Sequence, residues 1–186
     1  MTGLLALWLP ILVSAVIVFI ASAIIHTVLP WHKSDYGAVP NEDQVSAALR
    51  PFAIPPGDYM IPRAGSSADL KSPEFRGRLR EGPNLIVTVL PNGEWSMGRN
   101  LSLWFIYCLI VSALAACLTG LAAPPGSDPH AVFHFVAITA FIGYAVALWQ
   151  MSIWWRRSWM TTFKATVDGI IYALLTAATF AWLWPR

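Results

Sequence analysis

Two charged side chains stand one helical turn apart in a stretch that is apolar enough to cross a membrane. The stretch is TTFKATVDGIIYALLTAATFAWLWPR, residues 161–186, and the charges are Lys164 and Asp168. Placing a charge inside a bilayer costs free energy, so a charged side chain there usually faces protein or water and is a candidate functional residue. A carboxylate in this position could carry a proton, bind a cation or pin two helices together.

His26, in the first apolar run, is the natural partner for Asp168. It shares a helical stripe with Ser14 and Ser22 and lies near the same boundary of the membrane as Asp168. Lys164 is closer to the surface, where its long side chain can snorkel and pair with Asp168 at i, i+4. We expect His26, Lys164 and Asp168 to form a structural pin between the first and fourth helices; the alternative is a proton- or substrate-handling site.

A second histidine pair, His130 and His134, opens another apolar run at SDPHAVFH. The i, i+4 spacing places both imidazoles on one helix face, as in a metal site, but a zinc site needs a third ligand. Asp128 and the free N-terminus are the obvious further donors on that side, and Ser127 or Asp128 can cap the helix beside Pro129. We expect interfacial histidines here, with metal binding as the alternative. A bis-histidine haem is disfavoured because His26 and His134 lie at opposite membrane faces, so no cofactor is expected.

No catalytic signature accompanies these residues, and too few polar groups converge for an enzyme. Cys108 and Cys117 lie on one apolar run, point in roughly opposite directions on a helix and cannot form a disulfide. A net charge of +2 without a dense basic block gives no reason to expect a nucleic-acid partner. We therefore favour a non-enzymatic function.

The composition identifies the surroundings in which the chain folds. It is 56% hydrophobic and 12% charged, whereas soluble domains are about 45–50% apolar and about 25% charged. About 20 residues cross a hydrocarbon core of roughly 30 Å, and lipid offers no partner for unpaired backbone groups, so each spanning run must be helical. The sequence predicts an all-α membrane protein, a four-transmembrane-helix bundle with spans at 3–29, 101–123, 131–154 and 163–184.

These runs divide the chain into a first transmembrane helix (1–31), an insert (32–100) and a three-helix transmembrane segment (101–186). The first run contains the small-x-small sequence Ala21-Ser22-Ala23, as signal cleavage sites do. No basic residue precedes it and its apolar run is too long, so we expect it to remain uncleaved.

The basic residues predict the orientation. All but one of the 12 Lys and Arg residues lie in the insert or in the connection 153–164; the exception is Arg186. Because Lys and Arg are retained on the cytoplasmic side, we expect a cytoplasmic insert and both termini outside, in a bacterial inner membrane. Tryptophans at both expected interfaces agree with this orientation: Trp31, Trp104, Trp154, Trp155 and Trp159 at the inner one, and Trp8, Trp182 and Trp184 at the outer one.

The insert is predicted to be a small α+β segment. Residues 41–52 and 72–82 are typical of short helices capped by Asn41 and Ser72, and 85–97 predict a hairpin around Pro-Asn-Gly, with 55–62 as a further extended segment. A segment of this size is marginal as a separate domain, so we expect it to lean on the membrane or on a partner. One face fits either anionic headgroups or solvent: Phe75, Arg76, Arg78, Leu79 and Arg80.

Small residues recur at every fourth position on two of the spans. Such rows let backbones approach closely, and close approach drives helix association in lipid. We therefore expect helix-packing grooves that face the bundle or a neighbouring chain. They are Ala165, Gly169, Ala173, Ala177 and Ala181 on the last span, and Cys108, Ser112, Ala116 and Gly120 on the second.

Three functional hypotheses remain. The first is a non-enzymatic accessory or scaffold subunit of a membrane complex, which docks another membrane protein, a second copy or a cytoplasmic partner at 32–100. The second is a small transporter or channel subunit that uses Asp168 and His26. The third is a metal- or haem-associated membrane protein that uses His130 and His134.

Overall fold

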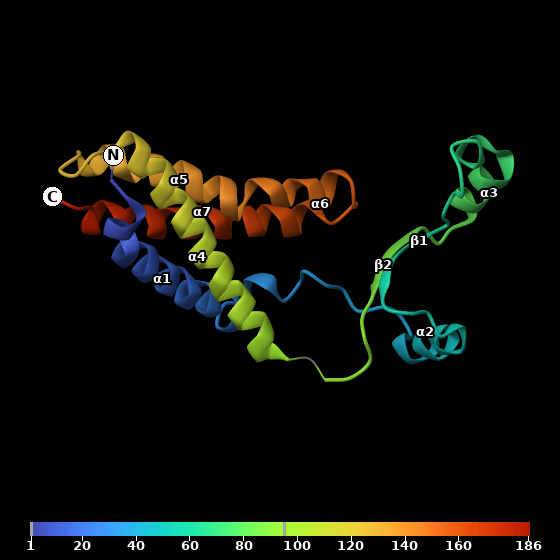
Figure 1. The fold of residues 1–186 in the computed structure, drawn as a ribbon. Helices are drawn as coiled ribbons and strands as arrows, with labels where there is room; N and C mark the ends of the chain where they lie inside the picture. The colour runs from blue at the N-terminus through green and yellow to red at the C-terminus, as the bar shows by residue number, and fades with distance from the viewer. Residues whose placement is uncertain (1, 95) are drawn as a thin grey trace. The chain divides into compact units, whose positions relative to one another are not determined.

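Four long apolar helices dominate the computed structural model, which describes residues 2–94 and 96–186 (Figure 1). Each is long and apolar enough to cross a bilayer, and a small insert with helices and two strands lies between the first and the second. The predicted fold class is therefore confirmed. The spans are Leu4–Thr27, which contains α1 (Trp8–Thr27); α4 (Met97–Ala122); Pro129–Ile153, which contains α5 (Pro129–Tyr144) and α6 (Trp149–Ile153); and α7 (Trp159–Leu183).

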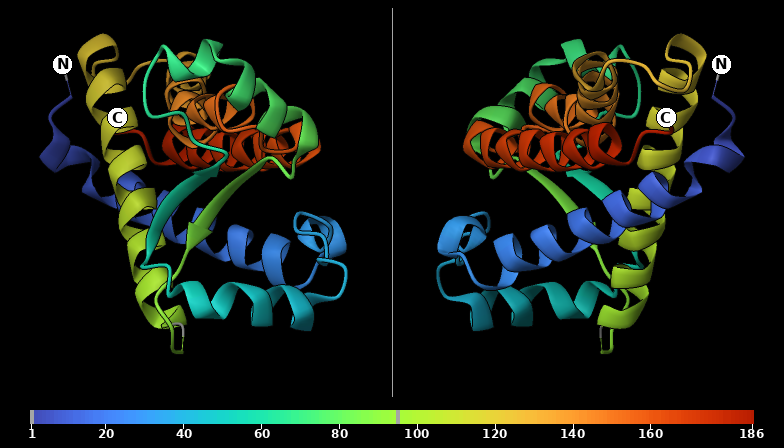
Figure 2. Two further views of the ribbon diagram at one scale, coloured as in Figure 1. Left: turned by 90° about the vertical axis from the view of Figure 1, so that its right-hand side faces the viewer. Right: turned by 90° about the vertical axis from the view of Figure 1, so that its left-hand side faces the viewer.

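The four spans form a ring in which each one contacts two neighbours. Helix α1 contacts α4 and α7, and α5 contacts the same two helices, most extensively α7. Helix α1 is therefore diagonal to α5, and α4 is diagonal to α7. The pairs α1–α4 and α5–α7 lie close together near the two termini and diverge toward the other end (Figures 1 and 2).

A side-chain cap marks where α5 begins. Of the two expected caps, Asp128 is the one found: its side chain accepts a hydrogen bond from the His130 backbone N–H at 3.1 Å, with Pro129 in the first turn. Helix α7 begins at Trp159, earlier than the expected Phe163. Asp168 thus lies roughly two and a half turns inside the helix, deeper than the sequence indicated.

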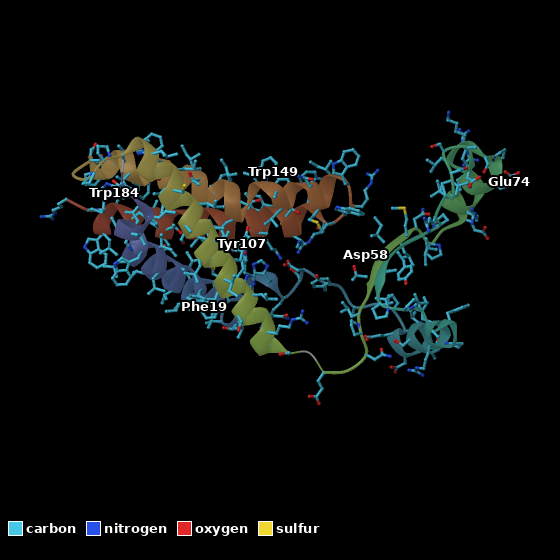
Figure 3. All side chains as sticks on the ribbon, in the orientation of Figure 1. Phe19, Asp58, Glu74, Tyr107, Trp149 and Trp184 are labelled. Carbon is cyan, nitrogen blue, oxygen red and sulfur yellow. The ribbon has the colours of Figure 1, made fainter. Side chains whose placement is uncertain are left out.

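The third span is interrupted, which the sequence did not predict. Helix α5 ends at Tyr144, Ala145 has non-helical angles (φ −126°, ψ −44°), and a 3₁₀ turn at Val146–Leu148 leads into α6. The Tyr107 hydroxyl of α4 donates to the Gly143 carbonyl beside the break, so this carbonyl keeps a partner in lipid. Tyr107 is labelled in Figure 3.

The small-residue rows lie inside the bundle but meet different partners. A Cβ added to Gly169 would lie 2.6 Å from the Ala145 Cβ, so α7 touches the break in the third span directly. On α4, Ser112 Oγ accepts from Ser14 Oγ of α1 at 3.0 Å. The buried members are Gly169, Ala173 and Ala177 on α7, and Cys108, Ser112, Ala116 and Gly120 on α4.

The core of the bundle consists of two apolar clusters. The first reaches the end with both termini, where Trp184 lies (Figure 3), and the second surrounds the break in the third span. The first contains Leu7, Ala115, Ala116, Ala123, Val132, Val136, Ala177, Phe180 and Trp184, and the second Ala15, Val18, Ile25, Cys108, Val111, Ala140, Tyr144, Tyr172 and Ala173.

The insert forms its own compact unit within residues 38–95. Its elements are α2 (Glu42–Leu49), β1 (Gly57–Ile61), α3 (Pro73–Glu81) and β2 (Leu85–Val89). The two strands pair antiparallel with Asp58 opposite Thr88, and the Thr88 hydroxyl donates to Asp58 Oδ1 at 2.6 Å. The Ser72 hydroxyl caps α3 as expected, accepting from the Phe75 N–H at 3.1 Å.

The predicted hairpin at 85–97 is wrong, because β2 pairs with β1 and Met97 already belongs to α4. The end of the expected second strand forms the start of helix α4 instead. The Ser96 side chain accepts from the Arg99 N–H and so caps α4, which begins at Met97. Trp95, also in that expected strand, lies outside the described residues.

Candidate functional site

Asp168 is buried at one end of the bundle and contacts a histidine that the sequence analysis did not single out. Its Oδ2 lies 2.7 Å from Nε2 of His32, which belongs to the 3₁₀ turn Pro30–His32 directly after α1. The other ring nitrogen of His32, Nδ1, lies 2.6 Å from Oδ2 of Asp35. One imidazole therefore bridges two carboxylates, and it links the segment after α1 to α7.

Lys164 completes this arrangement through a different carboxylate from the one expected. Its Nζ donates to Asp35 Oδ1 at 3.0 Å and to the Ser34 hydroxyl at 2.8 Å. The expected i, i+4 pair with Asp168 is replaced, because the chain after α1 folds back and brings Asp35 to the ammonium. We call Asp168, His32, Asp35 and Lys164 the polar network, and the bundle end that holds it the basic end.

The charges of the polar network compensate one another. Carboxylates only accept hydrogen bonds, so either both His32 nitrogens carry hydrogen or one carboxylate holds the proton. With an imidazolium and an ammonium, the two carboxylates are balanced. Burial alone would raise the pKa of Asp35, but its hydrogen bonds with His32 and Lys164 hold that pKa below the ordinary value.

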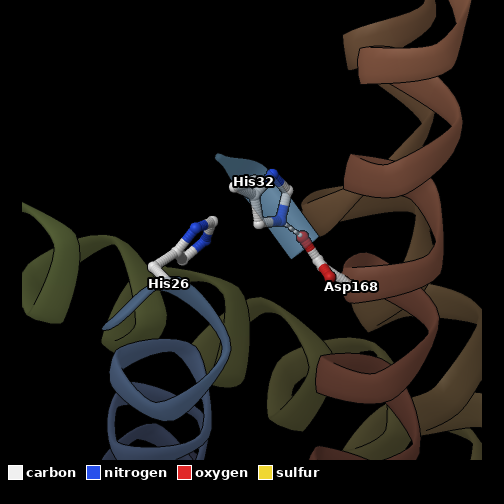
Figure 4. Close-up of side chains that lie close together, drawn as sticks. All are labelled: His26, His32 and Asp168. Carbon is white, nitrogen blue, oxygen red and sulfur yellow. Dashed lines mark hydrogen bonds and ion pairs between the residues drawn. The ribbon is translucent and has the colours of Figure 1, made fainter. Parts of the chain in front are cut away.

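His26, at the end of α1, lies against the polar network. Its ring centroid is 4.3 Å from that of His32, and the two rings are tilted by 36°. The expected contact between His26 and Asp168 is bridged by His32, which lies between them in Figure 4. One potential ligand atom from each of His26, His32 and Asp168 lies within 4.8 Å of the others.

A pocket of about 580 Å³ opens beside the polar network. Its lining combines the ionisable groups with aromatic residues from α4, α5 and α7. Tyr144 and Tyr172 are 6% and 5% exposed, and neither hydroxyl has a hydrogen-bond partner among the described residues. A buried, unpaired hydroxyl costs about 1–3 kcal/mol. The lining residues include His26, His32, Asp35, Trp104, Tyr107, Tyr144, Arg157, Asp168 and Tyr172.

His130 and His134 at the other end are held by local contacts. His134 Nδ1 lies 2.7 Å from the His130 carbonyl oxygen, one turn back on α5. Among residues 2–94 and 96–186, the one group of three clustered His, Cys, Asp or Glu donors is that of His26, His32 and Asp168. Metal binding at His130 and His134 stays a prediction, without a third donor in the described part of the chain.

Sequence reasoning missed His32 and Asp35. A signal for them exists in WHKSD, residues 31–35, which follows the first span directly and places a histidine and an aspartate three residues apart. What the sequence does not contain is the reversal of the chain that returns this segment to α7. Hydrophobic periodicity indicates which side chains share a face of one helix or strand, but it does not indicate where the chain turns back between two elements.

Comparison of the chain with protein-family models, with curated proteins and with solved structures found no match. The site is therefore interpreted from its own geometry.

Proposed function

We propose that this four-span integral membrane protein is a small transporter or channel subunit that handles a proton or a small cation at Asp168 and His26, together with His32. The observation that carries the proposal is an ionisable network, with Asp168 and Lys164 buried and His32 and Asp35 partly buried, beside a pocket of the bundle. Ionisable groups within membrane spans are energetically costly, and in membrane proteins they usually mark functional sites.

The interruption of the third span supports this proposal. Tyr144 and Leu148, on either side of the break, both line the pocket. Discontinuous helices beside a polar site recur in transporters, because unwound backbone can coordinate a passing ion. A purely structural pin requires neither a pocket nor a broken helix next to it.

The test is flux in proteoliposomes that contain purified protein, read with a trapped pH dye and, separately, a trapped zinc dye. We expect wild-type protein to conduct at least one of the two ions and Asp168→Asn to lose that flux while keeping its thermal stability, since only the ionisable group is removed. Asp128→Asn is the matched control, because asparagine caps a helix as well as aspartate does. A silent wild type, or full flux in a folded Asp168→Asn variant, would overturn the proposal.

The orientation is part of the same proposal. The distribution of Lys and Arg supports a cytoplasmic basic end in a bacterial inner membrane, with both termini outside. In a background without Cys108 and Cys117, a cysteine at Ser67 should be protected from a membrane-impermeant reagent in intact cells, and one at Gly126 should react. The opposite labelling would reverse the orientation.

The second candidate is an accessory or scaffold subunit that docks a partner protein through the insert. Its support is that residues 38–95 form a separate compact unit. Helix α2 and the following turn have no buried residue and expose Val45, Leu49 and Phe52 at 40%, 49% and 73%. A polypeptide that co-purifies with wild type and is lost with Phe52→Asp would favour this candidate, provided that ion flux is absent from both.

A further inference from the structure

We propose that His26, His32 and Asp168 bind one divalent transition-metal ion of the zinc type. Their ligand atoms lie within 4.8 Å of one another and come from three elements: the end of α1, the turn after it, and α7 (Figure 4). Zinc bonds to nitrogen and oxygen are about 2.0–2.2 Å, so ligand atoms around one ion lie within about 4 Å of each other. Binding therefore requires the His26 and Asp168 side chains to rotate and bring their ligand atoms closer together.

The donor types select the class of metal. Two imidazoles and one carboxylate suit Zn²⁺ and its first-row neighbours, whereas Mg²⁺ and Ca²⁺ prefer oxygen donors throughout. Three protein ligands leave one position of a tetrahedral ion open, as in sites that exchange a ligand and unlike closed structural sites.

The surroundings of His32 match those of a metal-ligating histidine. Such a histidine usually donates its second ring N–H to a carboxylate, which fixes the tautomer and turns the other nitrogen toward the ion. Asp35 occupies this position, 2.6 Å from His32 Nδ1, and accepts a hydrogen bond from Lys164, which also donates to the Ser34 hydroxyl. This arrangement leaves Nε2 as the nitrogen that faces Asp168 and the ion.

The ion would take the place of a proton. Without metal, a proton lies between His32 Nε2 and Asp168 Oδ2, 2.7 Å apart. Because ligands bind a metal only in their deprotonated form, the incoming ion displaces that proton to water, and both atoms then bond to the ion. The site gains one net positive charge, next to a pocket in which other ligands can compensate it.

The open coordination position would face the pocket with the unpaired hydroxyls of Tyr144 and Tyr172. Water or another small ligand on the ion would give these hydroxyls a partner. As the identification of the transported ion this inference rests on the proposed function, but metal binding at equilibrium is measured without transport.

The test is Zn²⁺ titration calorimetry with elemental analysis on full-length protein in lipid nanodiscs, purified without a His-tag. We expect one ion per chain. His26→Ala, His32→Ala and Asp168→Asn should each weaken binding by roughly 100-fold or more, and Asp35→Asn by about 10- to 100-fold, the range for a group that orients a ligand. His134→Ala is the matched control and should bind as wild type does. Co²⁺ replacement should give the intense visible absorption of a four-coordinate site, absent from His32→Ala.

Folded wild-type protein without stoichiometric metal would overturn the inference, as would binding that survives His32→Ala and is lost in His134→Ala. The outcome is distinguishable from that of the flux assay. Metal binding without any flux removes the proposed transport function alone, and flux of protons without metal binding removes the metal site alone.

Discussion

The bundle carries a histidine pair at each end, and the two pairs are built in different ways. His130 and His134 lie one turn apart on α5, where the His130 backbone N–H donates to Asp128 and the His134 ring contacts the His130 carbonyl. His26 and His32 belong to different elements, and His32 connects two carboxylates, one of them on α7. The pair with the regular spacing thus has local partners, whereas the irregular pair stands in a network that crosses the bundle.

The comparison indicates that residue spacing along one helix is a weak guide to a polar site in a membrane protein. A helical i, i+4 pair places two donors, and a third must come from another element. At the basic end this element is the short turn after α1, which returns His32 and Asp35 to α7. His32 contacts both carboxylates of the network, and Asp35 has Lys164 as a second partner.

The two ends should differ most in how much the free energy of unfolding falls when a carboxylate is removed. Asp168→Leu should lower the free energy of unfolding by roughly 3 kcal/mol, because it breaks a buried pair and leaves His32 without one acceptor. Asp168→Asn should cost much less, since the amide oxygen still accepts a hydrogen bond. Thermal unfolding in detergent measures both. If Asp168→Leu is as stable as wild type, the network does not hold the bundle together.

A glycine tests whether the close contact at the break is as tight as described. Gly169→Ala should destabilise by about 1–3 kcal/mol, because the new Cβ would lie 2.6 Å from that of Ala145. Gly98→Ala is the control in α4, where nothing lies within 4 Å of an added Cβ, and it should stabilise by roughly 0.5–1 kcal/mol through helix propensity. The same detergent assay decides. Equal effects of the two substitutions would mean that α7 and the third span are not in contact there.

The smallest effects belong to the end with His130 and His134. Asp128→Ala should cost about 1 kcal/mol through loss of the α5 cap. His134→Ala should change stability by less than about 0.5 kcal/mol, as for surface substitutions away from special features. Chemical unfolding in detergent resolves the two variants. A His134→Ala effect as large as that of Asp128→Ala would show that this histidine has a partner beyond its own helix.

Much of the fold was predictable, because it depends on local signals. The apolar runs and the Ser72 cap can each be recognised within one segment of the sequence. The strand pairing of the insert was not predictable from such local signals. The sequence offered β2 possible partners on both sides, and the residues on one side begin helix α4 instead. The break in the third span after Tyr144 could not be predicted either, because no proline lies there.

For the candidate site, the apolar runs predicted that Asp168, Lys164 and His26 lie toward the same end of the bundle, because backbone in lipid must form helices of known length. Only the tertiary structure decided their partners. The connection after α1 turns back, places His32 between Asp168 and Asp35, and moves Lys164 to Asp35. Hydropathy and helical period describe each span alone, whereas a polar network is decided by which ionisable groups from different elements can compensate one another away from water.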